Sequence, residues 1–316
     1  MFIIIAVGAY FLGALAIILD KFLLGSKRIS TPPVYAFYLG LFGLFASFAL
    51  LFVHFSFPSS FQITVSFLSG ILFTYGILAL YFAIKKSEAS RVVPVVGAVI
   101  PIVTFVASWF LLGEGLMREQ LFGVLLLVSG GLLISFDLPL RKEGRKFFAG
   151  FRAAILAGIL LAVATTLFKS VYEAQEFFSG FALTRIGAFF GALSFLLYPK
   201  WRREIFQSFK NVSSQSQRKK NFSTAVIFVG NKILGGFSSL GTNWAIALGS
   251  VTLVNALVPV QYVFVLFLAM LSAHFWPKIY AEKFSFNDWI QKVVAIALIA
   301  LGIVLISLRL QATLYM

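Results

Sequence analysis

Ten stretches of about 20 mostly apolar residues occupy most of this sequence, and each is long enough to cross a lipid bilayer as a helix. A helix rises 1.5 Å per residue, so a stretch of that length spans the roughly 30 Å hydrocarbon core. The stretches lack the polar and apolar alternation of barrel strands, which favours helices. They run over residues 2–24, 34–55, 63–84, 92–112, 120–136, 149–171, 178–198, 222–248, 253–275 and 289–308. We therefore expect an all-α integral membrane protein with ten transmembrane helices.

The composition excludes the other broad classes. Of the 316 residues, 60% are apolar, only 12% are charged and 38 are Phe, and the mean hydropathy is +0.97. Soluble globular chains are closer to 45–50% apolar and about 25% charged. A soluble, disordered or fibrous protein is therefore excluded.

The residue types predict no metal site, no cofactor and no catalytic residue. Cysteine is absent, and the two histidines, His54 and His274, lie far apart without the spacing of metal ligands. Eleven acidic residues are scattered mainly over the connections, without a cluster that would hold a metal–diphosphate. We therefore expect a protein that is not an enzyme.

The net charge of +15 has a topological explanation. Of the 26 Lys and Arg residues, 21 lie in or beside the connections after the first, third, fifth, seventh and ninth stretches. Basic residues accumulate on the cytoplasmic side of membrane proteins, so these connections are predicted inside and both termini outside. The surplus then faces anionic lipid rather than nucleic acid. The remaining five basic residues are Arg118, Lys169, Arg185, Lys232 and Arg309.

The longest connection, residues 199–221, carries seven basic residues against Glu204 alone. We expect a basic loop here, with a short interfacial helix around Trp201–Lys210.

The two halves of the chain, residues 1–140 and 147–310, resemble each other. Four pairs of segments match in the same order: LDKFLLGS with LFKSVYEA, FYLGLFG with TRIGAFFG, YFAI with NWAI, and GGLLIS with LGIVLIS. Each half holds five stretches, and five is odd, so consecutive copies cross the membrane in opposite directions. The sequence thus predicts two inverted five-helix repeats, as in many secondary transporters.

Two segments, Gly97–Glu114 and Gln120–Ser135, resemble EamA-like members of the drug/metabolite transporter superfamily. They carry a Pro within the fourth helix, a Gly-Glu at its end and a Gly-rich fifth helix. The second copy, Asn255–Ala269, keeps Pro259 but is followed by an additional stretch, HFWPKIYAEKF. The resemblance implies two five-helix repeats that transport a small metabolite. Members commonly have both termini in the cytoplasm, opposite to the charge bias of this chain.

Ionisable residues inside spans are candidates for function, because each costs at least about 2.5–3.5 kcal/mol to insert. Lys232 lies near the predicted bilayer centre, within a Gly-rich polar segment. We expect it to meet an anionic group of the substrate or to take part in proton coupling. The alternative is a lysine that snorkels to the interface or pairs with a carbonyl. Arg185 lies within snorkelling reach of the outer interface. A functional role and a purely structural role are equally favoured for it.

The remaining candidates follow from helix faces and prolines. Asn255, Pro259 and Tyr262 are spaced i, i+4 and i+7, which predicts one helix face. Packing is the rival explanation for the aromatic candidates. The predicted substrate-binding residues are Lys232, Asn231, Arg185, Asn255, Tyr262, Tyr75 and Trp244, and the predicted helix breaks are at Pro94, Pro101 and Pro259.

Together these features predict a secondary transporter of a small metabolite, amino-acid-like or an organic anion, in the cytoplasmic membrane. It would work by alternating access between the two halves. A lipid-linked sugar flippase of the same fold is the alternative, and a membrane-embedded lipid-modifying enzyme is less favoured. The expected partners are a small-molecule substrate and the lipid bilayer, with a homodimer as a further candidate and no nucleic acid.

Overall fold

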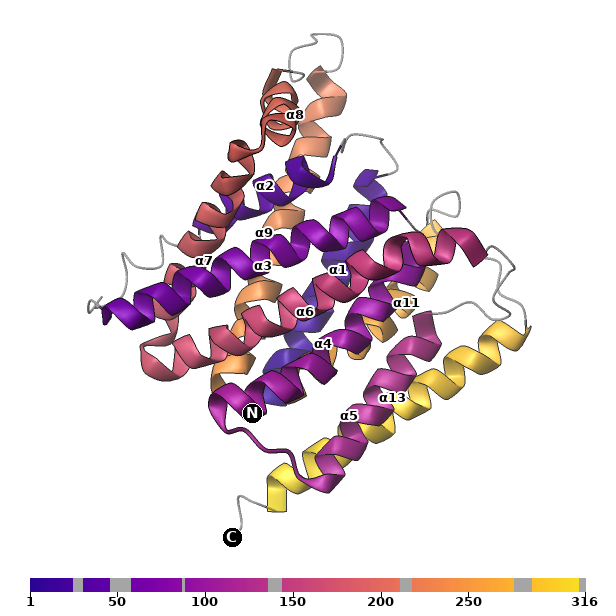
Figure 1. The fold of residues 1–316 in the computed structure, drawn as a ribbon. Coiled ribbons are helices and arrows are strands. Elements are labelled where there is room, and N and C mark those ends of the chain that lie inside the picture. The colour runs from indigo at the N-terminus through magenta and orange to yellow at the C-terminus, as the bar shows by residue number, and fades with distance from the viewer. Residues whose placement is uncertain are drawn as a thin grey trace. The chain divides into compact units, whose positions relative to one another are not determined.

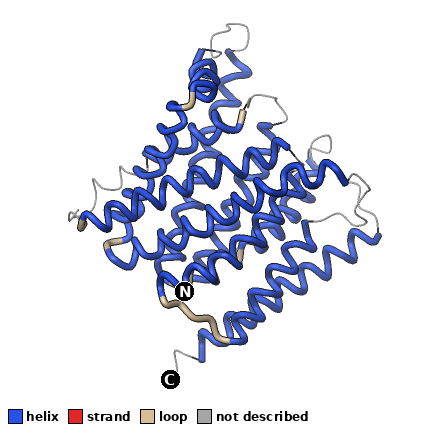
Figure 2. Tube along the Cα trace, in the orientation of Figure 1, coloured by secondary structure: helices blue, strands red, loops and turns tan. Residues whose placement is uncertain are grey.

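The computed structural model describes residues 1–24, 31–45, 58–86, 89–135, 144–210, 218–275 and 286–312. Within these ranges all regular structure is helical (Figure 2). The helices, labelled in Figure 1, are α1 (Phe2–Leu24), α2 (Pro32–Gly43), α3 (Ser60–Lys86), α4 (Ala89–Leu112), α5 (Arg118–Ser135), α6 (Gly144–Ala174), α7 (Phe177–Ser194), the 3-10 turn η2 (Phe195–Leu197), α8 (Pro199–Lys210), α9 (Arg218–Leu248), α10 (Val251–Ala256), α11 (Val258–Phe275) and α13 (Phe286–Ala312).

Eight segments of the described chain are long and apolar enough to cross a membrane, counting α10 and α11 as one. The other two predicted spans correspond to α2 and α9. Only 12 residues of the first are described as α2, and residues 46–55 of that predicted span lie outside the described part. The second, α9, has 31 residues but carries Asn231, Lys232 and Asn243, which lower its hydropathy. The chain is therefore an all-α protein of the multi-pass membrane type.

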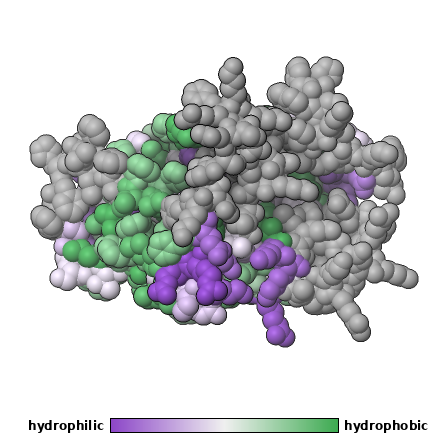
Figure 3. Space-filling model, turned by 90° about the horizontal axis from the view of Figure 1, so that it is seen from above, coloured by the Kyte–Doolittle hydropathy of each residue, from purple (hydrophilic) through white to green (hydrophobic). Residues whose placement is uncertain are grey.

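Apolar side chains on the outer faces of the helices fit this class. In α13, Ala295, Ile299 and Ile306 form a buried stripe, while Val293 and Leu301 on the opposite side are more than half exposed. A helix that is apolar all round requires an apolar surrounding on every side. Figure 3 shows such hydrophobic residues, in green, exposed over a broad area of the described surface.

The chain divides into two compact units. Unit 1 comprises residues 1–28, 115–142 and 215–316, and unit 2 comprises residues 29–114 and 143–214. Unit 1 therefore holds α1, α5, α9, α10, α11 and α13, and unit 2 holds α2, α3, α4, α6, α7, η2 and α8. Each unit takes helices from both predicted repeats, so the compact units cut across the boundary predicted near residue 140.

In unit 1, α5 and α13 pack side by side through their glycines (Figure 1). A Cβ atom added at Gly130 would lie 2.9 Å from the Ala295 carbonyl oxygen, and one added at Gly302 would lie 2.8 Å from the Gly123 carbonyl oxygen. As the residue number rises along α5 it falls along α13 in these contacts, so the two helices are antiparallel. Small residues at a crossing let helix backbones approach closely, as membrane helices require.

The first helix, α1, packs against α9, α10 and α11 in the same unit. The Ser238 hydroxyl of α9 donates to the Ala9 carbonyl at 2.8 Å, and the Tyr10 hydroxyl donates to the Val254 carbonyl of α10 at 2.8 Å. Phe11 meets Phe264 of α11 edge to face at 5.3 Å between ring centroids. Hydrogen bonds to backbone carbonyls thus join α9 and α10 to α1, and an aromatic contact joins α11 to it.

In unit 2, α3 is the central helix, with α6 and α7 packed along it. A Cβ atom at Gly70 would collide with the α7 backbone around Ala188, and the Thr74 hydroxyl donates to the Ala188 carbonyl at 2.9 Å. On the α6 side, a Cβ atom at Gly76 would lie 2.9 Å from the Leu161 side chain. Close contact at small residues therefore recurs in this unit.

Local signals set the helix ends. Ser59 and Gln62 form a capping box at the start of α3: the Gln62 amide donates to the Ser59 hydroxyl at 3.3 Å, and the Ser59 amide donates to the Gln62 side chain at 3.1 Å. At the other end of a helix, Gly113 ends α4 with φ at 67°, and the Glu114 amide donates to the Ser108 carbonyl at 3.2 Å. A left-handed Gly directly after the last helical residue is a common C-terminal cap, because Gly adopts a positive φ without strain.

The predicted helix breaks at Pro94 and Pro101 are not found, because α4 continues as one helix through both. Both prolines are buried, seven residues apart on one face. The third predicted break, at Pro259, agrees with an interruption at Leu257 between α10 and α11, where Pro259 is the second residue of the new helix. Pro259 has no N–H for the carbonyl of residue 255 and its ring crowds that carbonyl, which accounts for an interruption just before it.

The predicted basic loop of residues 199–221 is largely helical. It contains α8, close to the interfacial helix expected around Trp201–Lys210, and α9 already begins at Arg218. Trp201 and Ile205, four residues apart, pack on the rest of unit 2, which explains the helix. Residues 211–217 lie outside the described part.

The α5–α13 contacts predict that Gly130→Ala and Gly302→Ala each lower the melting temperature of the purified protein. Overpacking of this kind costs about 1–3 kcal/mol. Gly8→Ala is the control, since a Cβ atom there would meet nothing within 4 Å. Thermal unfolding in detergent measures the effect, and melting temperatures for the two α5–α13 variants equal to that of the control would contradict the packing.

Candidate functional site

Arg185 is a buried cation surrounded by aromatic rings. It is the ninth of 18 residues in α7, and only 7% of its surface is exposed. Its guanidinium carbon lies 4.6 Å from the ring centroid of Phe181, 5.4 Å from that of Phe73 and 5.7 Å from that of Phe168. These rings come from α7, α3 and α6, so three helices of unit 2 enclose the charge.

The enclosure follows from the local sequence. Phe181 precedes Arg185 by four residues and therefore shares its helix face. Phe73 and Phe168 also contact each other, at 5.7 Å between centroids, across the α3–α6 crossing. Each ring face attracts a cation by about 0.5–2 kcal/mol, which offsets part of the cost of burying the charge. The sequence placed Arg185 within snorkelling reach of the interface, but its guanidinium is held inside the unit.

A second buried cation follows Phe168 directly in the chain. Lys169 is 7% exposed, and its Nζ atom lies 3.2 Å from Oε1 of Glu173, one turn later in α6. Glu173 is half exposed. Tyr172, also on α6, lies close enough to the Arg185 guanidinium to interact with its charge. This part of unit 2 therefore holds two buried cations and one half-exposed carboxylate.

In unit 1, Lys232 lies at the middle of α9, as the fifteenth of its 31 residues. Its neighbour Asn231 is 1% exposed, whereas Lys232 itself is partly exposed. Further along α9, the Asn243 side chain donates to the Ser239 carbonyl at 2.7 Å. Trp244, also on α9, is 40% exposed. The polar residues of α9 thus continue over several turns.

The predicted common face of Asn255, Pro259 and Tyr262 is interrupted. Asn255 is buried on α10, while Pro259 and Tyr262 belong to α11 beyond the break at Leu257. Helical spacing does not carry across that break. Tyr262 is partly buried on α11.

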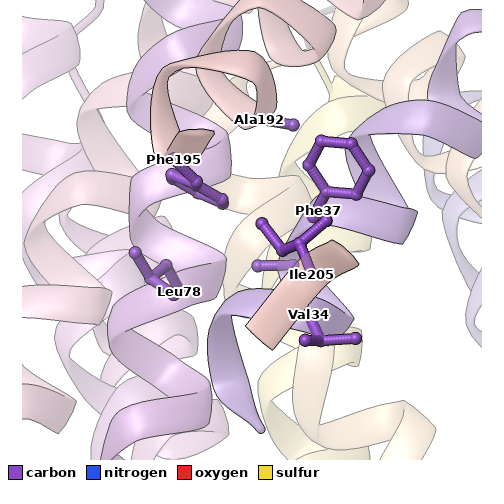
Figure 4. Packing of buried hydrophobic residues seen from close by; sticks show 7 residues of the cluster. Val34, Phe37, Leu78, Ala192, Phe195 and Ile205 are labelled. Atoms are coloured by element: carbon purple, nitrogen blue, oxygen red, sulfur yellow. The ribbon is translucent and has the colours of Figure 1, made fainter. Parts of the chain in front are cut away.

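Tyr75 belongs to an apolar cluster rather than to the charged group. Its ring meets Phe195 edge to face at 5.4 Å, and its hydroxyl lies 2.7 Å from that of Ser194. Val34, Phe37 and Leu78 are among the buried members of this cluster (Figure 4). Packing therefore accounts for Tyr75.

Of the predicted substrate-binding residues, Asn231, Lys232, Trp244, Asn255 and Tyr262 lie in unit 1, and Tyr75 and Arg185 lie in unit 2. The sequence did not single out Tyr10 or the Lys169–Glu173 pair as site residues. An i, i+4 spacing of opposite charges was the signal for the pair.

The described ranges contain no set of side chains arranged as metal ligands. No group of three or more His, Cys, Asp or Glu side chains there is placed to hold a metal ion. His54 lies outside the described residues, as does the side chain of His274.

Comparison with known proteins identifies the fold but no family. No protein-family model matches the chain. A 75-residue segment is 36% identical to an uncharacterized protein of Methanocaldococcus jannaschii, covering 24% of this chain and 54% of that protein. The chain thus matches about half the length of this curated relative. A solved structure, titled only as the crystal structure of a protein, matches 98% of this chain and 96% of its own with a TM-score of 0.65. At 17% identity, this likeness shows a shared fold alone.

The aromatic enclosure predicts an energetic coupling between Phe181 and Arg185. In a double-mutant cycle of Phe181→Leu and Arg185→Met, we expect a coupling of about 1 kcal/mol in thermal or denaturant unfolding. The control pairs Arg185→Met with Phe190→Leu. Phe190 also lies on α7 but its ring contacts those of Phe67 and Phe189. Additive effects in both cycles would contradict the cation–π contacts.

Proposed function

We propose that this protein is a secondary transporter of a small organic anion or amino-acid-like metabolite, working by alternating access in the cytoplasmic membrane. The observation that carries the proposal is Arg185, a cation enclosed halfway along a helix long and apolar enough to span the membrane. Ionised groups at such depth are costly and usually mark a substrate or ion pathway. Lys232, at the middle of α9, adds a second cation in the other unit.

An inverted repeat, the arrangement common in secondary transporters, is supported by the α5–α13 crossing. Aligning GGLLIS with LGIVLIS pairs Gly130 with Gly302, a shift of 172 residues that also pairs Gly123 with Ala295. The contact of Gly130 with the Ala295 carbonyl then has its counterpart in that of Gly302 with the Gly123 carbonyl. Such an exchange of roles is the signature of a two-fold axis, and the helices are antiparallel.

The α1–α9 and α3–α6 contacts also correspond to each other when two other pairs of matched segments are aligned. Aligning Lys21 with Lys169 shifts α1 onto α6 by 148 residues, and aligning YFAI with NWAI shifts α3 onto α9 by 162. With these shifts Gly13 corresponds to Leu161 and Ser238 corresponds to Gly76. Gly13 contacts Ser238 in unit 1, and Leu161 contacts Gly76 in unit 2, so the two contacts are equivalent in the repeat. Each unit would then combine the first helix of one copy with the third helix of the other.

The charges suggest how substrate is recognised. A carboxylate or phosphate group pairs well with a guanidinium, which offers five donors in a planar fork. The Phe rings around Arg185 leave its charge less hydrated than it is in water, which strengthens attraction to an anion. We infer that the anionic group of the substrate interacts with Arg185 in one state of the cycle. Lys232, in the middle of α9, is a separate candidate in the other unit.

The test is transport by the purified protein. Metabolites whose pools change in cells with and without the protein are first identified, and their uptake is then measured in proteoliposomes with and without a proton gradient. Arg185→Met and Lys232→Met are expected to reduce uptake at least tenfold without lowering the amount of protein in the membrane. The matched control is Arg152→Met, an exposed cation on α6. Wild-type uptake by both variants would overturn the proposal.

The charge bias predicts the orientation. A reporter that is active only outside the cytoplasm, fused after Met316, is expected to be active, and one that is active only in the cytoplasm is expected to be silent. The reverse pattern would place both termini inside, as the family resemblance implies, and would contradict the charge argument.

A further inference from the structure

One short helix, α8, has an outer face that the transport proposal leaves unexplained. It starts two residues after Leu197, where the apolar segment of α7 and η2 ends. If that segment spans the bilayer, α8 lies at the boundary between hydrocarbon and headgroups. We propose that the outer face of α8 binds the headgroups of anionic phospholipids.

The inner face of α8 is fixed to unit 2. Ile205 is fully buried in the apolar cluster with Val34 and Phe195 (Figure 4). The Trp201 ring meets Phe195 at 5.7 Å, and the Ser208 hydroxyl lies 3.1 Å from that of Tyr38 on α2. The helix is thus held in one rotation about its axis, and the same residues always face outward.

The outer face combines cations with apolar side chains. Lys200, Arg202 and Arg203 are exposed, and Phe206, which follows the two arginines by four and three residues, is 54% exposed. Leu197, just before the helix, is 84% exposed. Basic groups beside an exposed apolar side chain on one helix face are typical of helices that lie in a membrane interface.

The charge and the apolar residues together select the occupant. An anionic soluble protein would satisfy the cations but would leave Leu197 and Phe206 in water, whereas a lipid provides phosphate for the arginines and acyl chains for the apolar groups. Each basic side chain near an anionic membrane surface strengthens binding by a factor of about five, so two arginines contribute roughly thirtyfold.

The consequence is a stabilising effect of lipid on unit 2. Because α8 is bonded to α2 and packed on η2, a lipid that holds α8 also holds the ends of α2 and α7. We expect phosphatidylglycerol to raise the melting temperature of the protein, and phosphatidylcholine to leave it unchanged.

The test uses the full chain in detergent micelles, titrated with phosphatidylglycerol and, separately, with phosphatidylcholine and soluble glycerol phosphate. Binding is read from thermal stabilisation and from quenching of tryptophan fluorescence by brominated phosphatidylglycerol. The double variant Arg202→Gln/Arg203→Gln is expected to weaken binding of phosphatidylglycerol roughly thirtyfold. The control is Lys85→Gln/Lys86→Gln, which removes two exposed cations at the end of α3 and is expected to change binding less than threefold.

Three outcomes would overturn the proposal: equal loss in both double variants, equal effects of the two lipids on the wild type, or saturation by glycerol phosphate alone. Stabilisation of the wild type by phosphatidylglycerol but not by phosphatidylcholine keeps the proposal testable even if the arginine variant does not fold. The inference assumes that the spans cross a bilayer but does not depend on transport. A protein that binds the lipid and carries no metabolite would therefore refute only the transport proposal.

Discussion

Close contact between helix backbones at small residues is the constraint on which both compact units depend. Lipid removes the hydrophobic drive that holds soluble helices together, so membrane helices associate through tight packing and polar bonds. In this protein the contacts are made by glycines, at Gly130 and Gly302 in unit 1 and at Gly70 and Gly76 in unit 2. Hydroxyl groups add bonds to backbone carbonyls: Thr74 bonds across the same α3–α7 crossing as Gly70, and Ser238 bonds across the α1–α9 crossing.

Buried charge is the feature that packing alone does not explain. A fold built only for close contact has no need of a guanidinium among three phenylalanines, and an apolar side chain there would avoid the cost of burying a charge. Arg185 is nevertheless enclosed, with the Lys169–Glu173 pair on the neighbouring helix. The proposed use in recognising an anion would account for that cost, which is why the proposed function rests on this residue.

The sequence was informative where chemistry is local. Continuous apolar runs predicted the helical membrane class, and the ends of α1 agree with the predicted first span. The position of α8 follows from the spacing of Trp201 and Ile205. Tertiary environment decided the rest: Pro94 and Pro101 remain inside a helix while the chain breaks before Pro259, although the residue type is the same.

The candidate site was predicted less well, because helical spacing does not say which helices meet. Lys232 and Arg185 were identified by the rarity of charge in a span, but the rings around Arg185 come from three helices. No periodicity in α7 alone contains that information. Tyr75 illustrates the converse case, since an aromatic expected to face substrate packs in an apolar cluster.

The central claim is that two antiparallel copies exchange helices, so that α1 pairs with α9 as α6 pairs with α3. Because the chain has no cysteine, disulfide trapping in native membranes tests it directly. A Cβ atom at Gly241 would lie 3.0 Å from that of Ala9, and the repeat registers carry this pair onto Ala79 and Ala157. We predict that Ala9→Cys/Gly241→Cys and Ala79→Cys/Ala157→Cys both cross-link on oxidation, while Gly8→Cys/Gly241→Cys does not. Cross-linking of the first pair without the second would contradict the account.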